Sequence, residues 1–530
     1  MYIDHQQLPP EQQGPAGTGK DSRMNQPSTK ENADMGAQLD KAQKSIDRLF
    51  ATRNDRWYPL CHIASKSGWI NDPNGLSYFK GRYHAYFQLN PYGSEWGNMH
   101  WGHVSSADLV TWRREPLAMA PTLEVEKDGV FSGSAVVGDD GRLTIYYTGH
   151  RWRNGVNEDD GNLQEQCMAV SSDGIHFEKK GVVVPCPDDR ILHFRDPKVW
   201  KMNGLWYMVF GVSTPAHRGE IWMYTSKDME HWTFDRVIYR HPDPEVFMLE
   251  CPDMFPLEDK WVICYSAMGL KPHGFEARNH NNAGYVIGSW QPGGDFHQET
   301  EFHLWDDGHN FYAPQTFQAP DGRRLVFGWM SPFTEPIPMQ EDGWCGQFTV
   351  PREVTLAGDH LRCLPIREFS NLDQDQQDFG PIELEVNGSQ DLVDDAQTAD
   401  INMEIDLNKS LAERIGLEIH RTQSGDHTLV CYDDQLGRVV LDRHCNTYGD
   451  RGYRTAPVDK SSGKLKLRII VDRGSIEVVV NDGLEIMSSY SFPAEGPRGI
   501  RLIAESGEGK ALINSLSIAK LGTIWEQPDR

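Results

Sequence analysis

Residues 99–112 read MHWGHVSSADLVTW, and this stretch contains the first copy of a pattern that decides the fold. A strand-like segment leads into a Ser-x-Asp turn formed by Ser106 and Asp108, and Trp112 follows the serine by six positions. Serine and aspartate side chains close turns by bonding to nearby backbone groups. The pattern therefore predicts a turn that ends a strand, with an aromatic side chain packing back between neighbouring sheets.

The same spacing recurs twice, with Ser171 preceding Phe177 and Ser226 preceding Trp232. A degraded fourth copy is expected within residues 288–296. The three clear copies are 65 and 55 residues apart, whereas three unrelated turns would not be expected to share one spacing. Repeated units of roughly 40–50 residues with four strands each are typical of propeller blades. Residues 55–356 are long enough for five such blades.

The segments before the repeat differ from it in composition. Residues 1–34 are polar and rich in Pro, Gly and Gln, which predicts a disordered tail. Residues 35–54 are expected to contain a helix, because apolar side chains over 37–51 recur on roughly one face. This helix is expected to pack on the outside of the main domain.

The strand pattern weakens over residues 357–376, which are interpreted as a linker. Strand-like segments resume over 377–524 with a different pattern of residues. The stretch 464–487, KLKLRIIVDRGSIEVVVNDGLEIM, alternates apolar and polar residues on both sides of Arg473-Gly474, and its Asn-Asp-Gly is a hairpin signal. Such strands over this length predict a β-sandwich. Packing against the propeller is its simplest role; carbohydrate binding and a subunit interface stay open. The predicted fold class is all-β, a propeller followed by a sandwich.

Composition excludes several classes of protein. The chain has 530 residues and a formal net charge of −25, which argues against nucleic acid or an anionic membrane as partner. Nine cysteines without CxxC pairs or zinc-type spacing indicate free thiols in a reducing compartment. No signal-peptide run and no stretch of about 18 apolar residues occurs, so a cytoplasmic protein without a membrane helix is expected.

Three acidic residues stand out because each is followed closely by proline. Asp72 lies in WINDPNG (69–75), Asp196 in FRDPKVW (194–200) and Glu250 in MLECPDMF (248–255). Each motif alone is also an ordinary turn sequence. In a propeller, however, the innermost strands of different blades converge on one axis, so these distant acids are expected to share a pocket. Glycoside hydrolysis requires two carboxylates in different protonation states.

Neighbouring residues suggest how the acids would differ. Asn71 and Asn74 could donate hydrogen bonds to Asp72 and favour its ionised form. The weakly polar Met248 and Cys251 could raise the pKa of Glu250. Arg195 is expected to hold Asp196 ionised, which suits a residue that grips sugar hydroxyls without changing charge.

With these motifs, residues 57–520 closely resemble glycoside hydrolase family 32, which includes invertases and inulinases. The resemblance implies a five-bladed propeller and a sandwich, with Asp72 as nucleophile, Asp196 as transition-state stabiliser and Glu250 as acid/base. The stretches YFQLNP, WGNMHWGH, FSGSAV, FYAPQTF and GWM also look like the family. By position, the implied substrate-binding residues are Trp69, Ile70, Asn71, Gln88, Trp96, Phe131, Ser132, Arg195 and Trp329. Departures are small: the family often has Met or Leu at Ile70, and Asp where Asn310 stands, a change expected to alter a supporting contact or the leaving-group side.

The resemblance implies a retaining β-fructofuranosidase that acts on terminal fructosyl units of sucrose and short fructooligosaccharides. Alternatives on the same scaffold are a sucrose-6-phosphate hydrolase, which needs a basic patch at the pocket rim, and a fructosyltransferase. A propeller glycosidase for arabinose-containing glycans and a catalytically inactive sugar-binding protein are more distant possibilities. The expected partner is a small carbohydrate, no cofactor or metal is implied, and a homo-oligomer stays possible.

Overall fold

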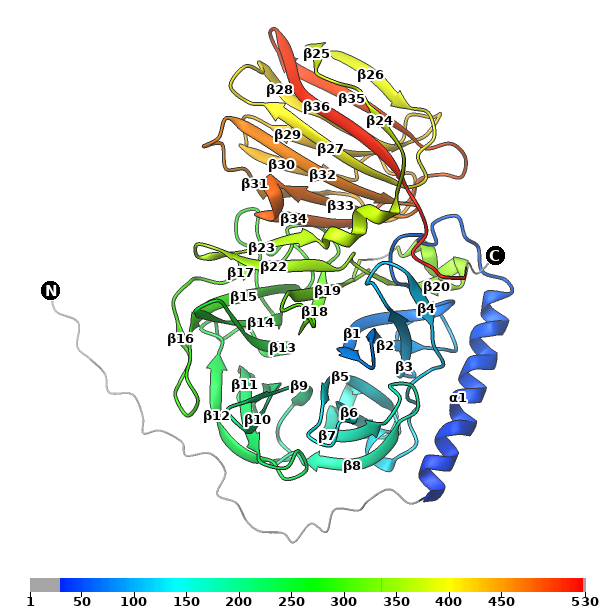
Figure 1. The fold of residues 1–530 in the computed structure, drawn as a ribbon, viewed down its shortest axis with the longest axis vertical. Helices are drawn as coiled ribbons and strands as arrows, with labels where there is room; N and C mark the ends of the chain where they lie inside the picture. Colours follow the sequence, from blue (N-terminus) through cyan, green and yellow to red (C-terminus); the bar gives the residue numbers. More distant parts are fainter. Residues whose placement is uncertain (1–28, 335, 528–530) are drawn as a thin grey trace, which may run out of the picture.

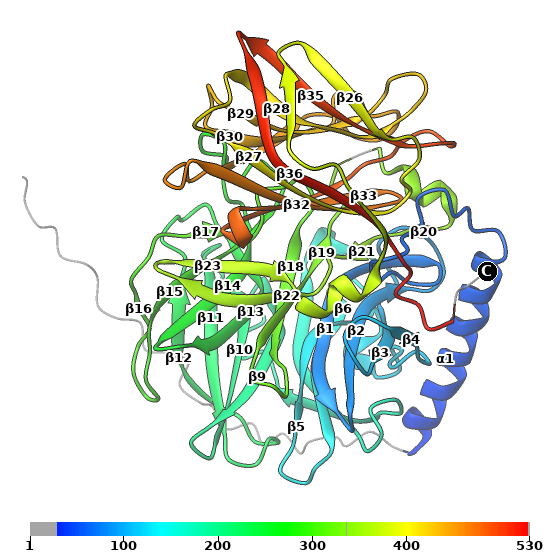
Figure 2. The same cartoon turned by 45° about the horizontal axis from the view of Figure 1, so that its top comes forward.

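The computed structural model describes residues 29–334 and 336–527, and strands make up most of it (Figure 1). Helix α1 (Thr29–Phe50) is followed by five sheets arranged as blades around one axis and then by two larger sheets that pack face to face. Figure 2 shows the sandwich lying against one side of the propeller. The prediction of a five-bladed propeller followed by a β-sandwich is confirmed.

The blades follow one another along the chain. Blade I contains β1 (Gly68–Phe79), β2 (Arg82–Asn90), β3 (His100–Ser106) and β4 (Trp112–Arg114), with β20 (Trp344–Cys345) beside β1. Blade II contains β5 (Gly129–Val137), β6 (Leu143–Trp152), β7 (Asn162–Ser171) and β8 (Glu178–Val184). Blade III contains β9 (His193–Met202), β10 (Leu205–Ser213), β11 (Gly219–Ser226) and β12 (Thr233–Arg240).

Blade IV contains β13 (Met248–Leu257), β14 (Lys260–Met268), β15 (Asn282–Ser289), β16 (His297–Gln298) and β17 (His303–Leu304). Blade V contains β18 (Tyr312–Gln318), β19 (Arg324–Met330), β21 (Gln347–Phe348), β22 (Arg352–Ala357) and β23 (His360–Pro365). Short 3₁₀ helices lie in the connections: η1 (Glu124–Glu126), η2 (Glu158–Asp160) and η3 (Pro338–Asp342). The innermost strands β1, β5, β9, β13 and β18 contact one another in order, and β18 contacts β1, which closes the ring.

The sequence repeat falls at one place in each blade. Ser106, Ser171 and Ser226 are the last residues of the third strands of blades I, II and III, and Ser289 occupies that position in blade IV. In the first three blades the following aspartate accepts hydrogen bonds from backbone N–H groups two and three residues further on. The repeat is therefore the turn that leads into the outermost strand.

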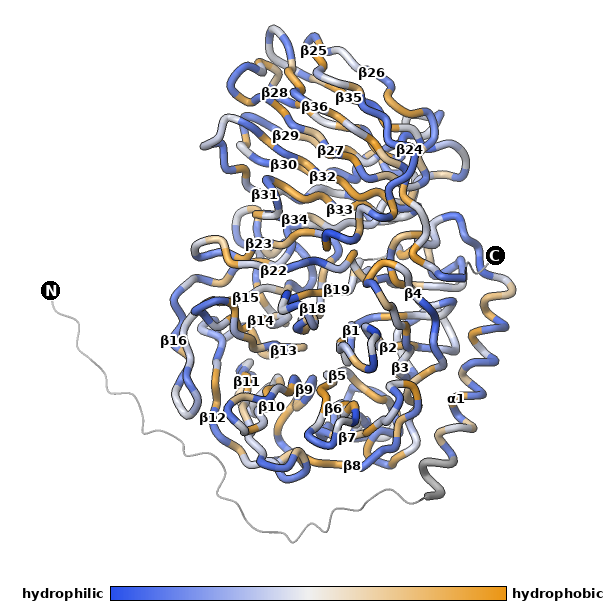
Figure 3. Tube along the Cα trace, in the orientation of Figure 1, coloured by the Kyte–Doolittle hydropathy of each residue, from blue (hydrophilic) through white to orange (hydrophobic). Residues whose placement is uncertain are grey.

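The sandwich consists of a seven-stranded and a six-stranded sheet. The first contains β24 (Asp373–Asp378), β25 (Ile382–Glu385), β27 (Ala399–Asp406), β32 (Lys464–Asp472), β33 (Ser475–Val480), β34 (Glu485–Tyr490) and β36 (Lys510–Leu521). The second contains β26 (Gly388–Val393), β28 (Ala412–Arg421), β29 (Thr428–Asp433), β30 (Arg438–Asp442), β31 (Tyr453–Pro457) and β35 (Gly499–Gly507). Figure 3 shows hydrophobic and hydrophilic residues alternating along these strands, and the apolar side chains form one buried core.

The hairpin signals of the sandwich are confirmed. Strands β32 and β33 pair on the two sides of Arg473-Gly474, and η5 (Asn481–Gly483) joins β33 to β34. Asn481, Asp482 and Gly483 all have positive φ angles, a conformation that these three residue types adopt more readily than others.

Three boundaries differ from the sequence expectation. The helix begins at Thr29, and the tail predicted for 1–34 otherwise lies outside the described residues. Ala42 and Ile46 bury their side chains against blade I, whereas Ala37 is exposed. Residues 357–376, expected to be an irregular linker, contain β23, η4 (Arg367–Leu372) and part of β24. Strand β24 escaped detection because it is an exposed edge strand of polar residues without alternation. Among the described residues no helix is long and apolar enough to cross a bilayer.

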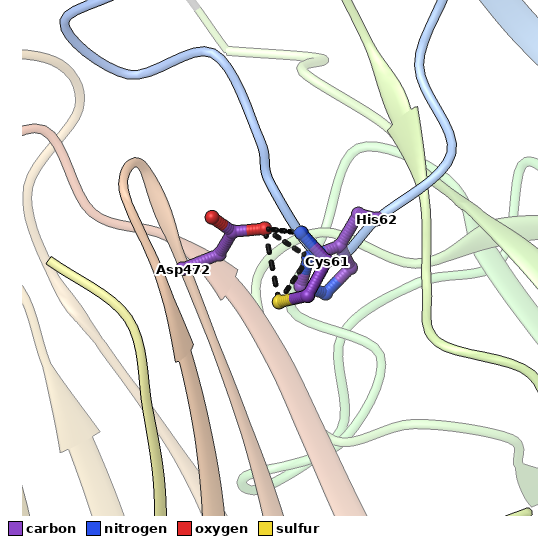
Figure 4. A group of neighbouring side chains, drawn as sticks. All are labelled: Cys61, His62 and Asp472. Atoms are coloured by element: carbon purple, nitrogen blue, oxygen red, sulfur yellow. Dashed lines mark hydrogen bonds and ion pairs between the residues drawn. The ribbon is translucent and has the colours of Figure 1, made fainter. Parts of the chain in front are cut away.

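A buried polar cluster joins the propeller domain to the sandwich (Figure 4). His62 Nδ1 lies 2.8 Å from Asp472 Oδ2, and its Nε2 lies 2.9 Å from Glu477 Oε1. The Cys61 thiol and the backbone N–H groups of Leu60 and Cys61 also donate to Asp472. Within the described part of the chain, Cys61, His62 and Asp472 are the one group spaced for a metal ion, with ligand atoms within 4.8 Å of one another.

The hydrogen bonds of this cluster fit an imidazolium ion better than a metal ligand. Both ring nitrogens of His62 face carboxylates, which only accept, so the ring donates from both. Burial alone would lower the pKa of His62, but its bonds to Asp472 and Glu477 raise it to about 9. Arg352 continues the network by pairing with Glu477 at 2.6 Å and Asp306 at 3.1 Å. Two cations (His62 and Arg352) and three carboxylates (Asp306, Asp472 and Glu477) thus link β33 of the sandwich to blade V and to residues 60–62.

The His62 cluster predicts a pH-dependent contribution to stability. A raised folded-state pKa means that this contribution is complete below the unfolded value of about 6.5 and is lost as the pH rises through about 9. His62→Asn should lower the unfolding free energy by about 3 kcal/mol at pH 6.5, because it removes the buried cation that pairs with Asp472 and also contacts Glu477. The gap in Tm between variant and wild type, measured by calorimetry, should shrink at pH 10. An equal gap at both pH values would contradict this assignment, and His231→Asn, at an exposed histidine, is the matched control.

Candidate active site

Each innermost strand carries a β-bulge at the same level of the propeller. The bulges fall at Asn71–Asp72, Ser132, Asp196–Pro197, Cys251–Pro252 and Ala313–Pro314. A bulge leaves one residue outside the ladder, and proline suits such a position because it has no N–H to pair. The prolines that follow the predicted acids therefore belong to, or directly follow, the β-bulges that turn these residues toward the axis.

The bulges surround a cavity of about 380 Å³ at the propeller axis. Asp72, Asp196 and Glu250, which come from three different blades, all line it. The other residues that line it are Trp69, Asn71, Gln88, Trp96, Met99, Phe131, Ser132, His150, Trp152, Glu158, Asn162, Gln164, His193, Arg195, Met268, Asn281, Tyr312, Trp329 and Phe333.

Asp72 accepts hydrogen bonds at both carboxylate oxygens. Ser132 Oγ donates to Oδ2 at 2.5 Å, the Cys251 thiol donates to the same oxygen at 3.3 Å, and Asn71 Nδ2 donates to Oδ1 at 3.1 Å. Burial raises the pKa of Asp72, and these three donors oppose the rise. Asn71 therefore acts as expected, whereas Asn74 instead accepts a bond from the Gly133 N–H.

Asp196 is the most deeply buried of the three acids, with 4% of its side chain exposed. The backbone N–H of Cys251 donates to its Oδ2 at 2.9 Å, and Arg195 Nε lies 3.7 Å from the same oxygen. Burial raises the pKa of Asp196 to about 7, despite the charge of Arg195. Arg195 lowers the pKa of Asp196 in the expected direction, but burial and the neighbouring carboxylates outweigh its charge.

Glu250 is more accessible, with 19% of its side chain exposed. Arg195 Nη2 donates to its Oε1 at 2.7 Å, and the Tyr312 hydroxyl donates to its Oε2. Met248 is fully buried, and the Cys251 thiol faces Asp72 and Asp196. The contacts of Glu250 are thus a guanidinium and a phenol, rather than the two sulfur-containing neighbours expected from the sequence.

Eight of the nine predicted substrate-binding residues line the cavity: Trp69, Asn71, Gln88, Trp96, Phe131, Ser132, Arg195 and Trp329. The exception is Ile70, whose side chain is fully buried in the core between α1 and blade I. Successive side chains of a strand point to opposite faces, so Ile70 must point away when Trp69 and Asn71 face the cavity. Trp96 is 48% exposed, which places it at the mouth.

Sequence reasoning missed a second set of residues on the cavity wall. The most informative of these are Tyr312, which contacts Glu250, and His193, which contacts Arg195. Tyr312 directly precedes Ala313-Pro314, so the repeated X-Pro signal could have found it. Asn310 does not line the cavity; it bonds Ser331, Tyr490 and Arg443 where blade V meets the sandwich.

Comparison with known proteins agrees with this geometry. Residues 62–365 match the model of the Glycosyl hydrolases family 32 N-terminal domain, and residues 368–520 match that of the family 32 C terminal. The sucrose-6-phosphate hydrolase of Escherichia coli is 40% identical over 490 residues, which span 92% of this chain and 99% of the relative. The raffinose invertase of Escherichia coli is 38% identical over 93% of this chain and 99% of its own length.

Among solved structures, the GH32 beta-fructofuranosidase of Bombyx mori superposes with a TM-score of 0.81 at 31% identity. The superposition covers 93% of this chain and all of that one. Both domain models and the full-length relatives lead to one conclusion: this chain is a glycoside hydrolase and belongs to family 32.

Proposed function

We propose that this protein is a retaining β-fructofuranosidase that releases fructose from sucrose or its 6-phosphate. The observation that carries the proposal is the convergence of Asp72, Asp196 and Glu250 on one cavity, with different hydrogen-bond donors around each. Retaining glycosidases need a nucleophilic carboxylate and a separate acid/base carboxylate about 5–5.5 Å away.

Asp72 is the proposed nucleophile. Its carboxylate attacks the anomeric C2 of the fructosyl unit and forms a covalent ester as the glycosidic bond breaks. Ser132 and Asn71 hold the two carboxylate oxygens in place, so that attack requires little reorientation of the side chain. Water then cleaves the ester, and two inversions at C2 give net retention.

Glu250 is the proposed acid/base. It donates a proton to the glycosidic oxygen as the leaving sugar departs and then removes a proton from the attacking water. Arg195 stabilises the carboxylate that remains after the first step, and the Tyr312 hydroxyl fixes the second oxygen of the group. The greater exposure of Glu250 suits a residue that must meet both the leaving sugar and the incoming water.

Asp196 is proposed to bind hydroxyl groups of the fructosyl ring and to stabilise positive charge in the transition state. It lies deepest in the cavity and is anchored by the Cys251 N–H. Its role requires the ionised form, because only the anion opposes the charge of an oxocarbenium-like ring.

The leaving group is expected to be the glucosyl unit of sucrose. Relatives carry the names sucrose-6-phosphate hydrolase and raffinose invertase, and a variant of the Bombyx mori enzyme binds sucrose. Most of the relatives' names favour the phosphorylated sugar. Among the described residues that line the cavity, however, Arg195 is the one cationic side chain, and its Nη2 is bonded to Glu250.

No disulfide joins the nine cysteines, all of which lie within the described residues, and this supports the proposal of a reducing, cytoplasmic location. Transfer of fructose to another sugar competes with hydrolysis whenever an acceptor reaches the ester before water. We therefore expect minor transferase activity at high sucrose concentration.

The assignment of Glu250 and Asp72 predicts different behaviour of two variants. Glu250→Ala should lower kcat on sucrose by roughly 10²–10⁴-fold, and azide, which attacks the covalent ester in place of water, should give a fructosyl azide of retained configuration. Asp72→Ala should lose activity at least as severely, and any azide product should be inverted. Released fructose and product stereochemistry by NMR are the measurements. Fructose release from neither sucrose nor 1-kestose by wild type would refute the fructosidase proposal.

The composition of the cavity wall predicts little preference for phosphate. A charge-assisted hydrogen bond contributes about 1.5–3 kcal/mol, and the wall offers no second cation to supply one. The kcat/KM for sucrose-6-phosphate should therefore lie within about tenfold of that for sucrose, as measured by fructose release. A preference of 100-fold or more for the phosphorylated sugar would show that a cationic group outside this wall reaches the substrate.

The raised pKa of Asp196 predicts the acidic limb of the pH profile. Since the ionised form is required, kcat/KM should fall about tenfold per pH unit as the pH drops below about 7. Initial rates on sucrose at low substrate concentration between pH 4 and 9 give this limb directly. A limb near pH 4, the ordinary range of aspartate, would contradict the predicted effect of burial.

A further inference from the structure

The guanidinium of Arg195 links two residues of the cavity wall. Its Nη2 donates to Glu250 Oε1 at 2.7 Å, and its Nη1 lies 2.5 Å from His193 Nδ1. Asn162 Nδ2 lies 3.1 Å from the same ring nitrogen. His193 is therefore one guanidinium away from the proposed acid/base.

These contacts fix the tautomer of His193. Arginine can only donate hydrogen bonds, so Nδ1 must accept and carries no proton. The proton of the neutral ring is then on Nε2. Burial and the adjacent Arg195 charge both lower the pKa of His193, which keeps the ring neutral at physiological pH. The chain thus presents a fixed N–H donor from a ring that lines the cavity.

The position of His193 indicates which part of a substrate this donor meets. It is the first residue of β9 and precedes Asp196 by three positions, or roughly 10 Å of strand. Asp196 is 4% exposed, whereas Glu250 and His193 are both half-buried, so these two side chains lie nearer the mouth of the cavity than Asp196 does. The group that receives the proton of Glu250 is the leaving sugar, which must lie on this outer side.

We propose that His193 binds the leaving group, with Nε2–H donating to an oxygen of the departing glucosyl unit. This inference rests on the proposed function. It also explains why a neutral donor stands here, since a lysine or arginine in place of His193 would put a second positive charge beside Arg195. His193 would thus set the preference for a sugar leaving group.

The test compares two substrates that share the fructosyl unit. Sucrose has a glucosyl leaving group with several hydroxyls, whereas the methoxy group of methyl β-D-fructofuranoside has no oxygen other than the glycosidic one for His193 to bind. The informative variant is His193→Asn, because its Oδ1 can still accept from Arg195 while the Nε2 donor is lost. We expect kcat/KM for sucrose to fall roughly tenfold or more, and that for the methyl fructoside to change less than about twofold.

A role limited to positioning Arg195 gives a different result. Methanol is a poorer leaving group than glucose and depends more on proton donation, so a displaced Arg195–Glu250 pair would slow the methyl fructoside at least as much as sucrose. Equal losses on both substrates would therefore overturn the inference while leaving the fructosidase assignment intact. Failure of wild type to hydrolyse either substrate would instead refute the proposed function, and this inference with it.

Two further measurements make the comparison secure. The inhibition constant of free fructose should be unchanged in His193→Asn, which shows that the fructosyl site is intact. His176→Asn, at a histidine that is 81% exposed in a turn of blade II, is the matched control and should leave both substrates unaffected. A rise in the fructose inhibition constant equal to the loss on sucrose would place His193 in the fructosyl site and overturn the inference.

Discussion

The site depends on one constraint, which is that five innermost strands must each bend at the same level of a closed ring. Each strand bends through a bulge; in three of the five the bulge contains an X-Pro pair, and in β1 the proline directly follows the bulge. The residue beside the proline leaves the ladder and turns its side chain or its N–H toward the axis. Asp196, Cys251 and Ala313 adopt positive φ angles to do so, which the surrounding pairs of strands enforce.

The bulges bring three carboxylates together. The residues of the cavity wall reduce the repulsion between these carboxylates, and each carboxylate has a different set of hydrogen-bond and ion-pair partners. One guanidinium, that of Arg195, contacts both Asp196 and Glu250, while Asp72 relies on uncharged donors. Three carboxylates in a buried space with one guanidinium cannot all ionise freely. Burial raises the pKa of Asp72 and Asp196, and the charge of neighbouring carboxylates adds to this rise.

Local sequence was enough to predict the propeller, the sandwich and the convergence of the three acids on one cavity, but not the partners of the acids. The Ser-x-Asp repeat located the blades, since it marks a turn made by neighbouring residues. Arg195 was expected to serve Asp196, its neighbour in sequence, yet its closest carboxylate is Glu250, 55 residues away on the next blade. Which carboxylate Arg195 contacts depends on how neighbouring blades pack, and a local sequence pattern does not contain this information.

The same reason explains the other differences. Ile70 lies within the motif WINDPNG but faces the core, because strand alternation overrides proximity to Asp72. Tyr312 and His193 were missed because their chemistry arises only from contact with Glu250 and Arg195. Strand β24 was taken for linker because an exposed edge strand shows no alternation.

The sandwich supports the site from outside, since none of its described residues lines the cavity at the propeller axis. Asn310, two residues before Tyr312, donates to the Ser331 carbonyl and accepts from the Tyr490 N–H and from Arg443 of the sandwich. The Tyr490 hydroxyl donates to the Met330 carbonyl at 2.8 Å. These bonds hold the open end of the β18–β19 pair, where Tyr312 lies opposite Trp329. Since Tyr312 in turn fixes Glu250, the sandwich stabilises the proposed acid/base through blade V. An aspartate in place of Asn310 would lose the donor to Ser331 while gaining a charge next to Arg443.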